Sequence, residues 1–495
     1  MEKNRRKAFL VLAVVLMACF CISACVINVG IKKDPLELAV RGQQPERTPI
    51  YEHAGWIIAR SSLHNHTTYS DGCRTPEDLL ELARMQGMSV LSITDHREGK
   101  ICAGERGVVC ARVGGIEDYG YDVYFNHLKK LAAAAQKQGM ILLQGVEVFP
   151  WFWNYGKFPA LVLDGLQHHF VVYDVYDPKV FENMPARRHI TISPEPIPDA
   201  APWQRWVDYM LDHGAIVHAV HVEEGEDMWI GPVHGACPPP IKNLHRLQGL
   251  TGFAIFPSGW REKAGGPGGL WDTTLVEYLL GMRDKPMWAH GEADYHCDGS
   301  LAWATSLLYM KEFTLAEVKR CLREGRVVSL QGDAFQDTYV AEWWVADSEE
   351  PEDLVMLGQE VTLKGAPLVR FALDRPVDGL TIRLVRNGRV IAEVEGSELT
   401  YRDQELGLRK EPVYYRVEVS GPRAKWAERS SSEAASSPFT SDAKAMMQEA
   451  GEDPQTMAES ELRVNPIFVR FEGRKNLLAR LAGDFPWLSF LPGTR

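Results

Sequence analysis

Helices that stop at glycine and lead into short apolar runs recur between residues 56 and about 335. Gly87, Gly139 and Gly214 each end such a helix, and the runs SVLSIT, ILLQGVEV and AIVHAVHV follow them. Glycine suits the left-handed turn at a helix C-terminus, and alternating strands and helices are typical of parallel sheets covered by helices. The pattern predicts an α/β fold, a barrel of parallel strands over residues 56–335, with the aromatic segment 149–202 as an insertion.

Short alternating segments replace this pattern after about residue 351. VRFALD, LTIRLVRNGRVIAEV and VYYRVEV alternate apolar and polar residues, and Asn387-Gly388 is typical of a tight hairpin turn. We therefore expect a small all-β sandwich domain over residues 351–475. Residues 420–460 are rich in Ser, Ala, Glu and Asp and indicate a mobile loop within it, and residues 476–495 form an apolar tail.

Basic side chains precede an apolar run at the N-terminus, where MEKNRRK is followed by Ala8 to about Ile31. This layout predicts a signal peptide or membrane anchor at 1–31 and a linker at 32–55. The sequence ending in Cys25 resembles a bacterial lipobox, in which that cysteine carries a lipid; an uncleaved helix and an ordinary cleaved signal are the alternatives. We expect an exported protein, anchored to the membrane on its periplasmic or extracellular face.

Charge and cysteine content narrow the choice of partners and redox chemistry. The 495 residues suffice for two folded domains, and the net charge of −12 lacks the basic footprint of extended nucleic-acid binding, so we expect no long nucleic acid as a partner. Six of the nine cysteines lie beyond the leader, and none forms a CxxC pair. A disulfide is allowed in oxidising surroundings, with Cys102 and Cys110 closest in sequence, but we expect free buried thiols for most.

Histidine and aspartate gather at the ends of the first two predicted strands. In SSLHNHTTYSDG, His64 and His66 are two residues apart, so both imidazoles project from one face of a strand. Asp71 follows in a Ser-Asp-Gly turn, and His96 ends the next strand in Thr-Asp-His. Imidazole and carboxylate ligands suit zinc, manganese or iron. The HNH triplet follows a strand and lacks the hairpin and helix of an HNH nuclease, so we set that interpretation aside.

Further candidate ligands end later strands. Glu147 lies in GVEV, where a carboxylate can bridge two metals, and Asp294 and His296 lie in HGEADYHCDG. Because functional residues of such barrels gather at the C-terminal ends of the strands, these residues agree with one another in space despite their separation in sequence.

The ordered series HxH, SDG, TDH, GVE, two strand histidines and DxH resembles the PHP (polymerase and histidinol phosphatase) superfamily over residues 56–335. The resemblance implies a distorted (β/α)7 TIM-like barrel with two or three divalent metals, and it implies phosphoesterase activity. It further implies a first metal at His64, His66, Glu147 and Asp294, a second bridged by Glu147 and held by two histidines, and a third at Asp71, His96 and His296.

The two histidines of the second metal are less certain from the sequence. His169 directly precedes the run FVVYD and fits better than His168, which would point to the opposite side. His221 occupies the place where many relatives carry Asn-His-Pro, but this chain reads Val-His-Val, and His218 competes. We favour His169 and His221 and keep both alternatives open.

The C-terminal segments VYYRVEVSG and VNPIFV are similar to the β-sandwich of exported PHP proteins of the carbaryl-hydrolase type. That similarity implies hydrolysis of esters, carbamates or phosphoesters. Small phosphoesters, nucleotides among them, are therefore the first expected substrates, and carboxylic or carbamic esters are the second. A non-catalytic surface module that binds a glycan or a partner is a third hypothesis, against which the nearly complete ligand set argues.

As a mechanism, we hypothesise that a metal-bridging hydroxide attacks the ester, so that no protein nucleophile is required. Glu147 serves as the bridge and Asp71 as a proton shuttle. Arg97 and Arg261 are candidates for binding a substrate anion, although a solvated surface arginine is an equally ordinary role for each.

Overall fold

The computed structural model describes residues 25–28, 49–103, 109–157, 160–186, 189–190, 200–230, 233–240, 244–256, 264–297, 300–348, 356–423 and 459–472. Several predicted segments lie wholly or largely outside these ranges: the leader at 1–31, the linker at 32–55, the loop at 420–460 and the tail at 476–495. Arg261 lies outside them too. Among the described helices, none has the length and apolar character needed to span a membrane.

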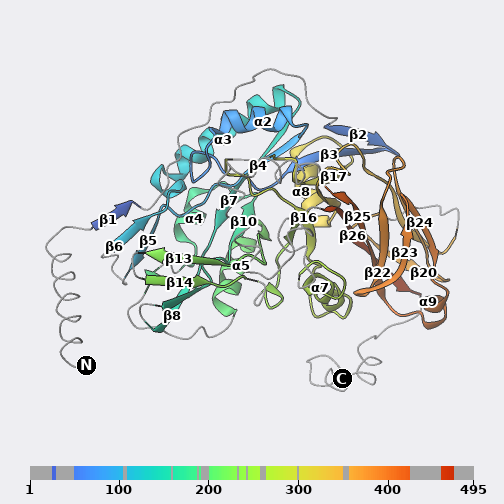
Figure 1. Cartoon of the computed structure of the whole chain (residues 1–495). Coiled ribbons are helices and arrows are strands. Elements are labelled where there is room, and N and C mark those ends of the chain that lie inside the picture. The colour runs from blue at the N-terminus through green and yellow to red at the C-terminus, as the bar shows by residue number, and fades with distance from the viewer. Residues whose placement is uncertain are drawn as a thin grey trace.

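One hydrogen-bonded sheet of 15 strands organises the chain (Figure 1). Its central path begins at β16 and ends at β23. In spatial order it runs β16 (Trp288–Gly291), β15 (Gly252–Phe256), β12 (Ile216–Ala219), β10 (Phe170–Tyr173), β7 (Ile141–Val148), β4 (Val90–Ile93), β3 (Trp56–Ser62), β17 (Ala304–Met310), β18 (Val327–Gln331), β26 (Glu459–Phe471), β25 (Val413–Arg423), β22 (Thr381–Arg386) and β23 (Arg389–Glu395). β2 (Ile50–His53) and β20 (Glu360–Leu363) pair beside this path with β3 and β26.

The strands of this sheet are mixed in direction, and the predicted all-parallel arrangement is wrong at β10, β17 and β18. β3, β4 and β7 are parallel, as are β12, β15 and β16, but β10 runs antiparallel to both β7 and β12. A parallel neighbour needs a long crossover, usually a helix. The described chain between β7 and β10 forms the strands β8 (Trp153–Lys157) and β9 (Ala160–Asp164) instead, so it returns antiparallel.

The segment predicted as an insertion contributes to two small four-stranded sheets, on the left in Figure 1. One sheet has the order β8, β9, β14 (Val233–Cys237), β13 (Glu226–Ile230). The other sheet joins β1 (Cys25–Asn28), β6 (Val109–Arg112), β5 (Lys100–Ala103) and β11 (His189–Ile190). In the sequence, β5 begins four residues after His96 and β8 six residues after Glu147.

The three helices predicted to end at Gly87, Gly139 and Gly214 form as α2 (Pro76–Met85), α3 (Tyr121–Lys137) and α5 (Ala201–Asp212). The structure also contains α7 (Leu270–Leu279), α8 (Leu315–Glu324) and the short α4 (Pro178–Asn183) and α9 (Gln404–Arg409). The hydroxyl of Thr75 caps α2 by accepting from the Asp78 amide at 3.2 Å. Gly87, Gly139 and Gly214 have φ of 75°, 74° and 78°, the left-handed turn expected after each helix.

Among the described residues, the hydrogen-bonded path of the sheet ends at β16, and two side chains bridge from there to its neighbours. The hydroxyl of Ser306, in β17, accepts from the Gly291 amide at 2.9 Å and donates to the Gly291 carbonyl at 3.0 Å. The amide of Asn465, in β26, accepts from Ala289 and donates to its carbonyl, both at 2.9 Å. These bonds satisfy the backbone of β16 as a paired strand would.

The C-terminal strands pack around a second apolar core. β19 (Val340–Ala346), β21 (Leu368–Leu373) and β24 (Glu398–Arg402) form a three-stranded sheet whose Trp343 and Phe371 share a buried cluster with Tyr415 and Val464 of the main sheet. The hairpin β22–β23 turns at Asn387 and Gly388, both at positive φ, as predicted. β25 and β26 belong to the 15-stranded sheet, so these strands continue the N-terminal architecture directly.

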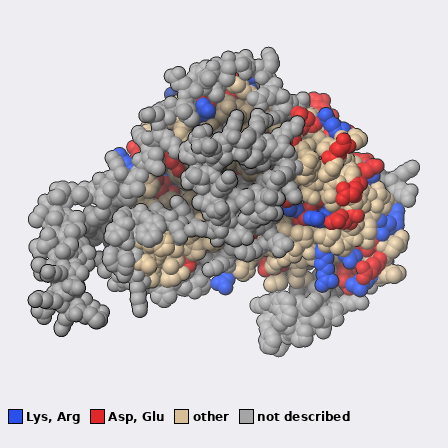
Figure 2. All heavy atoms as spheres, in the orientation of Figure 1, with Lys and Arg blue, Asp and Glu red and all other residues tan. Residues whose placement is uncertain are grey.

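A buried ionic network joins α7 to the C-terminal strands. The guanidinium of Arg416, fully buried, donates to both carboxylate oxygens of Asp272 at 2.6 and 2.8 Å, and to Glu418, which also contacts Arg463. The hydroxyl of Tyr414 donates to Asp272 at 2.6 Å. By contrast, Figure 2 shows acidic and basic side chains interspersed over the exposed C-terminal strands, where pairs such as Arg383 with Glu393 form.

Disulfides correct the expectation of mostly free thiols. Cys73 and Cys297 form a disulfide although 224 residues separate them, and Cys102 is disulfide-bonded as well. The register of β5 and β6 places Cys110 opposite Cys102. Cys237 and Cys321 are free and buried, as expected. Burial raises the pKa of the Cys321 thiol to about 12, so this thiol stays protonated and unreactive.

We expect Arg416→Leu to lower the free energy of unfolding by about 3–5 kcal/mol, because it leaves the Asp272 carboxylate buried without its cation. Arg383→Leu is the matched control. Arg383 is 44% exposed and pairs with Glu393 at 2.7 Å, and its loss should cost less than about 1 kcal/mol. Urea unfolding followed by circular dichroism measures both. Equally small changes in the two variants contradict a stabilising role for the buried network.

Candidate metal centre

His64 and His66 follow β3 directly and turn their rings into the same buried space. Their Nε2 atoms are 3.1 Å apart, and both side chains are fully buried. Asn65 points the other way, where its amide donates to the carbonyl of Ser92 at 2.8 Å and its carbonyl accepts from Ser62 at 2.9 Å. Strand alternation and the anchoring of Asn65 therefore aim the two imidazoles at one point.

Glu147, at the end of β7, lies at the centre of the cluster. Its Oε2 is 3.1 Å from His64 Nε2, 3.0 Å from His66 Nε2 and 3.1 Å from His96 Nδ1. Its Oε1 accepts from His169 Nδ1 at 2.8 Å and from His221 Nε2 at 3.0 Å. One fully buried carboxylate thus faces five imidazoles: Oε2 contacts three of them and Oε1 contacts the other two.

Asp294 contacts the same two histidines, His64 and His66. Its Oδ1 is 3.3 Å from His64 Nε2 and 3.2 Å from His66 Nε2. Asp294 has φ of 46°, and His221 has φ of 31°. Positive φ costs a non-glycine residue free energy and persists only where the surroundings impose it, and such strain gathers at functional sites.

Asp71, His96 and His296 form the outer edge of the cluster. Asp71 Oδ2 is 3.6 Å from His96 Nε2 and 3.3 Å from His296 Nε2, and Asp71 Oδ1 is 3.4 Å from His66 Nδ1. The rings of His66 and His296 stack with centroids 4.1 Å apart. The Asp71 side chain is 41% exposed, so this edge of the cluster opens to solvent.

The structure distinguishes the alternatives for the strand histidines. His169 and His221 both contact Glu147, whereas His168 packs on Trp203 with ring centroids 4.5 Å apart. His218 packs against His290, with centroids 4.3 Å apart, away from Glu147. A strand that alternates its faces sends neighbouring histidines to opposite sides, which is why His168 turns away while His169 reaches the carboxylate.

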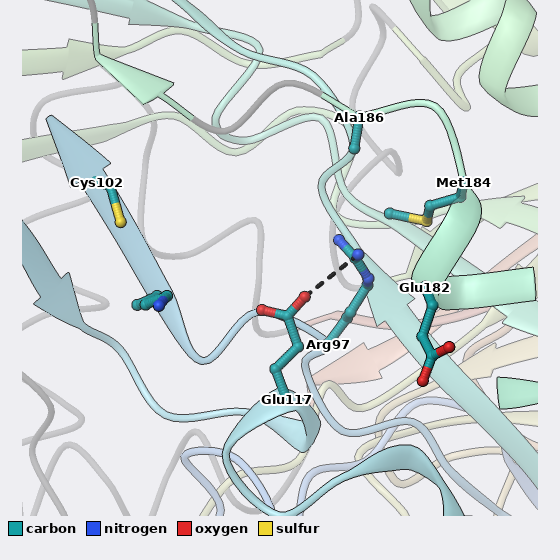
Figure 3. A pocket seen from close by; sticks show the side chains of 7 residues that line it. Arg97, Cys102, Glu117, Glu182, Met184 and Ala186 are labelled. Atoms are coloured by element: carbon teal, nitrogen blue, oxygen red, sulfur yellow. Dashed lines mark ion pairs between the residues drawn. The ribbon is translucent and has the colours of Figure 1, made fainter. Parts of the chain in front are cut away.

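Arg97 takes a structural position, which does not support the predicted role in binding a substrate anion. Its Nε donates to the Tyr121 hydroxyl at 2.8 Å, and its terminal nitrogens contact the Phe181 carbonyl at 3.0 Å and Glu117 at 3.2 Å. Figure 3 shows this guanidinium beside Glu117 in a cavity of about 270 Å³. Cys102, Glu182, Met184 and Ala186 also line the cavity, and none of the candidate metal ligands does.

Polar residues that the sequence patterns did not identify contact the candidate ligands or the residues beside them. Glu292 Oε2 lies 3.3 Å from His64 Nδ1 and 3.1 Å from His290 Nε2, and both residues are buried. Asp95 accepts from the amide and hydroxyl of Thr67 and from Ser70, each at 2.7 Å. Glu292 and His290 lie two and four residues before Asp294. Because side chains alternate along a strand, this spacing indicates that the three share one face, and it could have identified them from the sequence.

The donor set fits divalent metal ions. Three groups place their ligand atoms within 4.8 Å of one another: His64, His66, Glu147 and Asp294; His66, Asp71, His96 and His296; and His96, Glu147 and His169. Glu147 Oε2, Asp294 Oδ1, Asp71 Oδ1 and His96 Nδ1 are buried and lack a hydrogen-bond partner. Buried polar atoms without partners are costly, and cations bound by these groups would give them partners.

The electrostatics of the cluster favour charged carboxylates and a neutral outer imidazole. Burial disfavours the charge of Glu147, but the surrounding histidines hold the pKa of its carboxyl well below the usual range. Burial lowers the pKa of His96 to about 4. At His66 and His221 burial acts in the same direction, but the neighbouring carboxylates outweigh it and raise the pKa to about 10 and about 9. Carboxylate and neutral imidazole are the forms in which these side chains bind metals.

The comparisons with known proteins agree with the motifs. Residues 62–165, less than half of the chain, match the PHP domain family, and this segment carries His64, His66, Asp71, His96 and Glu147. No curated protein matches the chain.

Three solved structures are similar at low identity. A two-domain protein from Bacteroides vulgatus, assigned a PHP-like metal-dependent phosphoesterase, is 12% identical with a TM-score of 0.34, over 76% of this chain and 94% of that one. A protein from Bifidobacterium adolescentis assigned as a metal-dependent phosphoesterase is 13% identical (TM-score 0.25; 51% and 89% covered). An amidohydrolase from Chromobacterium violaceum, with bound sulfate and no metal, is 17% identical (TM-score 0.27; 54% and 97% covered).

We expect Glu147→Gln to weaken metal binding at least about tenfold, because the amide removes the anionic oxygens that face five imidazoles. Elemental analysis after dialysis against a fixed concentration of free zinc or manganese gives the metal content per chain. His127→Ala controls for loss of a polar group, since His127 pairs with Glu77 at the surface. An unchanged metal content in Glu147→Gln contradicts a metal centre at this carboxylate.

The Glu292 carboxylate, which contacts His64, allows a second test of metal binding. Glu292→Gln should lower metal affinity about 10- to 100-fold, the usual effect of losing the group that orients a metal-binding histidine. Glu77→Gln alters a partly exposed histidine–glutamate pair that is 2.7 Å long, and should leave metal affinity unchanged. Titration with a competing chelator compares the two. Equal affinities in both variants contradict the role of Glu292 in orienting His64.

Proposed function

We propose that this chain is a metal-dependent hydrolase of the PHP type that cleaves small phosphoesters: phosphomonoesters, phosphodiesters or nucleotides. One observation carries the proposal: the buried Glu147 carboxylate contacts five imidazoles through its two oxygens. Such a carboxylate, shared between two groups of imidazoles, could help to hold two divalent ions. The mixed sheet around it corresponds, in this proposal, to a distorted (β/α)7 barrel.

Three sets of side chains would hold two or three ions of zinc, manganese or iron. His64, His66, Glu147 and Asp294 form the inner set. Glu147, His169 and His221 form the second, with Glu147 shared. Asp71, His96 and His296 form the outer set. The first and last of these sets agree with the groups that the geometry brings within 4.8 Å.

Divalent ions held in this way make the attacking water more acidic and neutralise the charge that develops on the ester oxygens. The chain's own residues then need to bind, orient and move protons. Glu147, at no exposure, keeps a fixed negative charge at the base of the site. Asp71, whose side chain is 41% exposed, lies at the solvent edge and is the group able to pass a proton between the site and bulk water.

A second candidate function uses the same residues to cleave carboxylic or carbamic esters. The position of Arg97 favours it. Because the Arg97 guanidinium is committed to Tyr121, Phe181 and Glu117, it does not offer its charge to a phosphate. A neutral or singly charged ester needs no such cation.

The proposal includes export and attachment to the membrane through the N-terminal segment, by a lipid on Cys25 or by a helix. The disulfide between Cys73 and Cys297 supports export, and so does the disulfide-bonded state of Cys102. Disulfides persist in the periplasm and outside the cell and are rare in the cytosol.

Turnover of model esters tests the function. The purified full chain, stripped of metal and reloaded with manganese or zinc, should hydrolyse p-nitrophenyl phosphate or bis-p-nitrophenyl phosphate faster than p-nitrophenyl acetate. His64→Ala and Asp294→Ala should lower turnover at least about 100-fold, since each removes a ligand of the inner set. His127→Ala should retain it.

The pattern of activities separates the hypotheses. Preference for p-nitrophenyl acetate selects the ester or carbamate function over the phosphoester function. A metal-loaded chain that cleaves none of the three substrates favours a non-catalytic binding module. Turnover and metal content that survive both His64→Ala and Asp294→Ala contradict catalysis by this cluster.

A further inference from the structure

Asp71 and His296 have the most exposed side chains among the candidate ligands. Asp71 lies in the turn between β3 and α2, and His296 in the segment between β16 and β17. Their side chains are 41% and 28% exposed, whereas those of His64 and Glu147 are fully buried. A backbone bridge between Asn65 and Tyr295 holds the segment before His296 against the end of β3. A second link, after His296 in the sequence, joins this segment to the turn that carries Asp71.

The Cys73–Cys297 disulfide joins the two loops immediately beside both ligands. Cys73 follows Asp71 by two residues, and Cys297 follows His296 directly. The Cα atoms of the cysteines are 4.9 Å apart, across 224 residues of sequence, and both side chains are buried. Beside the bond, the Cys73 amide donates to the His296 carbonyl at 2.9 Å. The backbone that carries one ligand is thereby held against the backbone that carries the other.

The short links between each cysteine and its ligand have little freedom. A Cβ at Gly72 would lie 2.3 Å from the carbonyl oxygen of His66, so the turn between Asp71 and Cys73 is pressed against the strand end. On the other loop, the Tyr295 hydroxyl donates to the Cys297 carbonyl at 2.8 Å and accepts from Arg74 at 2.9 Å. A constraint applied at the cysteines therefore reaches the ligands.

We propose that Cys73 and Cys297 are positioning residues of the metal centre. Their disulfide sets the separation of Asp71 Oδ2 and His296 Nε2, 3.3 Å in the structure, and with it the affinity of the outer set of Asp71, His96 and His296 for a divalent ion. Without the bond, ion binding must also order the two loops. The free-energy cost of that ordering lowers the affinity for the ion. The inference rests on the proposed metal-dependent function.

The test compares metal binding by the full chain, the double variant Cys73→Ala/Cys297→Ala and the control Cys102→Ala, which alters a disulfide-bonded cysteine away from these two loops. Metal content is measured by elemental analysis over a range of free zinc concentrations. We expect the double variant to bind one ion about 10- to 100-fold more weakly, the range seen when supporting groups of a metal site are lost. The remaining ions and the Cys102→Ala control should keep wild-type affinity.

His296→Ala in the disulfide-intact chain should weaken one ion as the double variant does, which identifies the site concerned. A double variant with the wild-type set of affinities overturns the proposal. So does a double variant in which every ion weakens equally and the metal-free chain melts earlier, because that result reports general destabilisation.

A measurement on the intact chain covers the case in which the double variant does not fold. Because coupling between two equilibria is reciprocal, saturating zinc should lower the ratio of reduced to oxidised Cys73–Cys297 at fixed dithiothreitol by the same 10- to 100-fold factor. Thiol alkylation and mass spectrometry measure this ratio. The protection should disappear in His296→Ala, and equal reduction with and without zinc overturns the inference. A wild-type chain that binds no metal defeats the proposed function itself, whereas a metal-binding chain that is indifferent to the disulfide defeats only this inference.

Discussion

The Glu147 carboxylate is the contact on which the rest of the site depends. It is buried at the end of a central strand, and it gathers imidazoles from β3, from the ends of β4 and β12 and from the residue before β10. A carboxylate in such a place is tolerated only with strong partners. The strand order β3, β4, β7, β10, β12 places Glu147 in the middle strand of the five. The order of the strands therefore brings the imidazoles together around this carboxylate.

Local patterns in the sequence predicted much of this arrangement. The glycine-terminated helices form as expected, and the spacing of His64 and His66 places both rings on one face because a strand repeats every two residues. The same alternation favoured His169 over His168, and the structure places His169 against Glu147. Each of these inferences uses residues that are neighbours in sequence, where backbone geometry alone determines direction.

Features that depend on distant parts of the chain escaped prediction. The reversed direction of β10 follows from the absence of a crossover helix among the described residues before it. The environment of Arg97 depends on Phe181, 84 residues away, and the partner of Cys73 lies 224 residues along the chain. Glu292 is one strand step from Asp294, but its role becomes visible only once His64 is seen beside it. No pattern confined to a short window contains such contacts.

The place of β26 has a consequence for how this molecule is made. This strand is the last described element of the chain, yet it pairs with β18 and supplies the Asn465 amide that satisfies the backbone of β16, the strand that leads to Asp294. A nascent chain that has emerged only as far as β18 therefore lacks the partner of that strand and the amide that satisfies Ala289 in β16. The sheet that carries the candidate metal ligands is therefore completed only when the strand ending at Phe471 has been made.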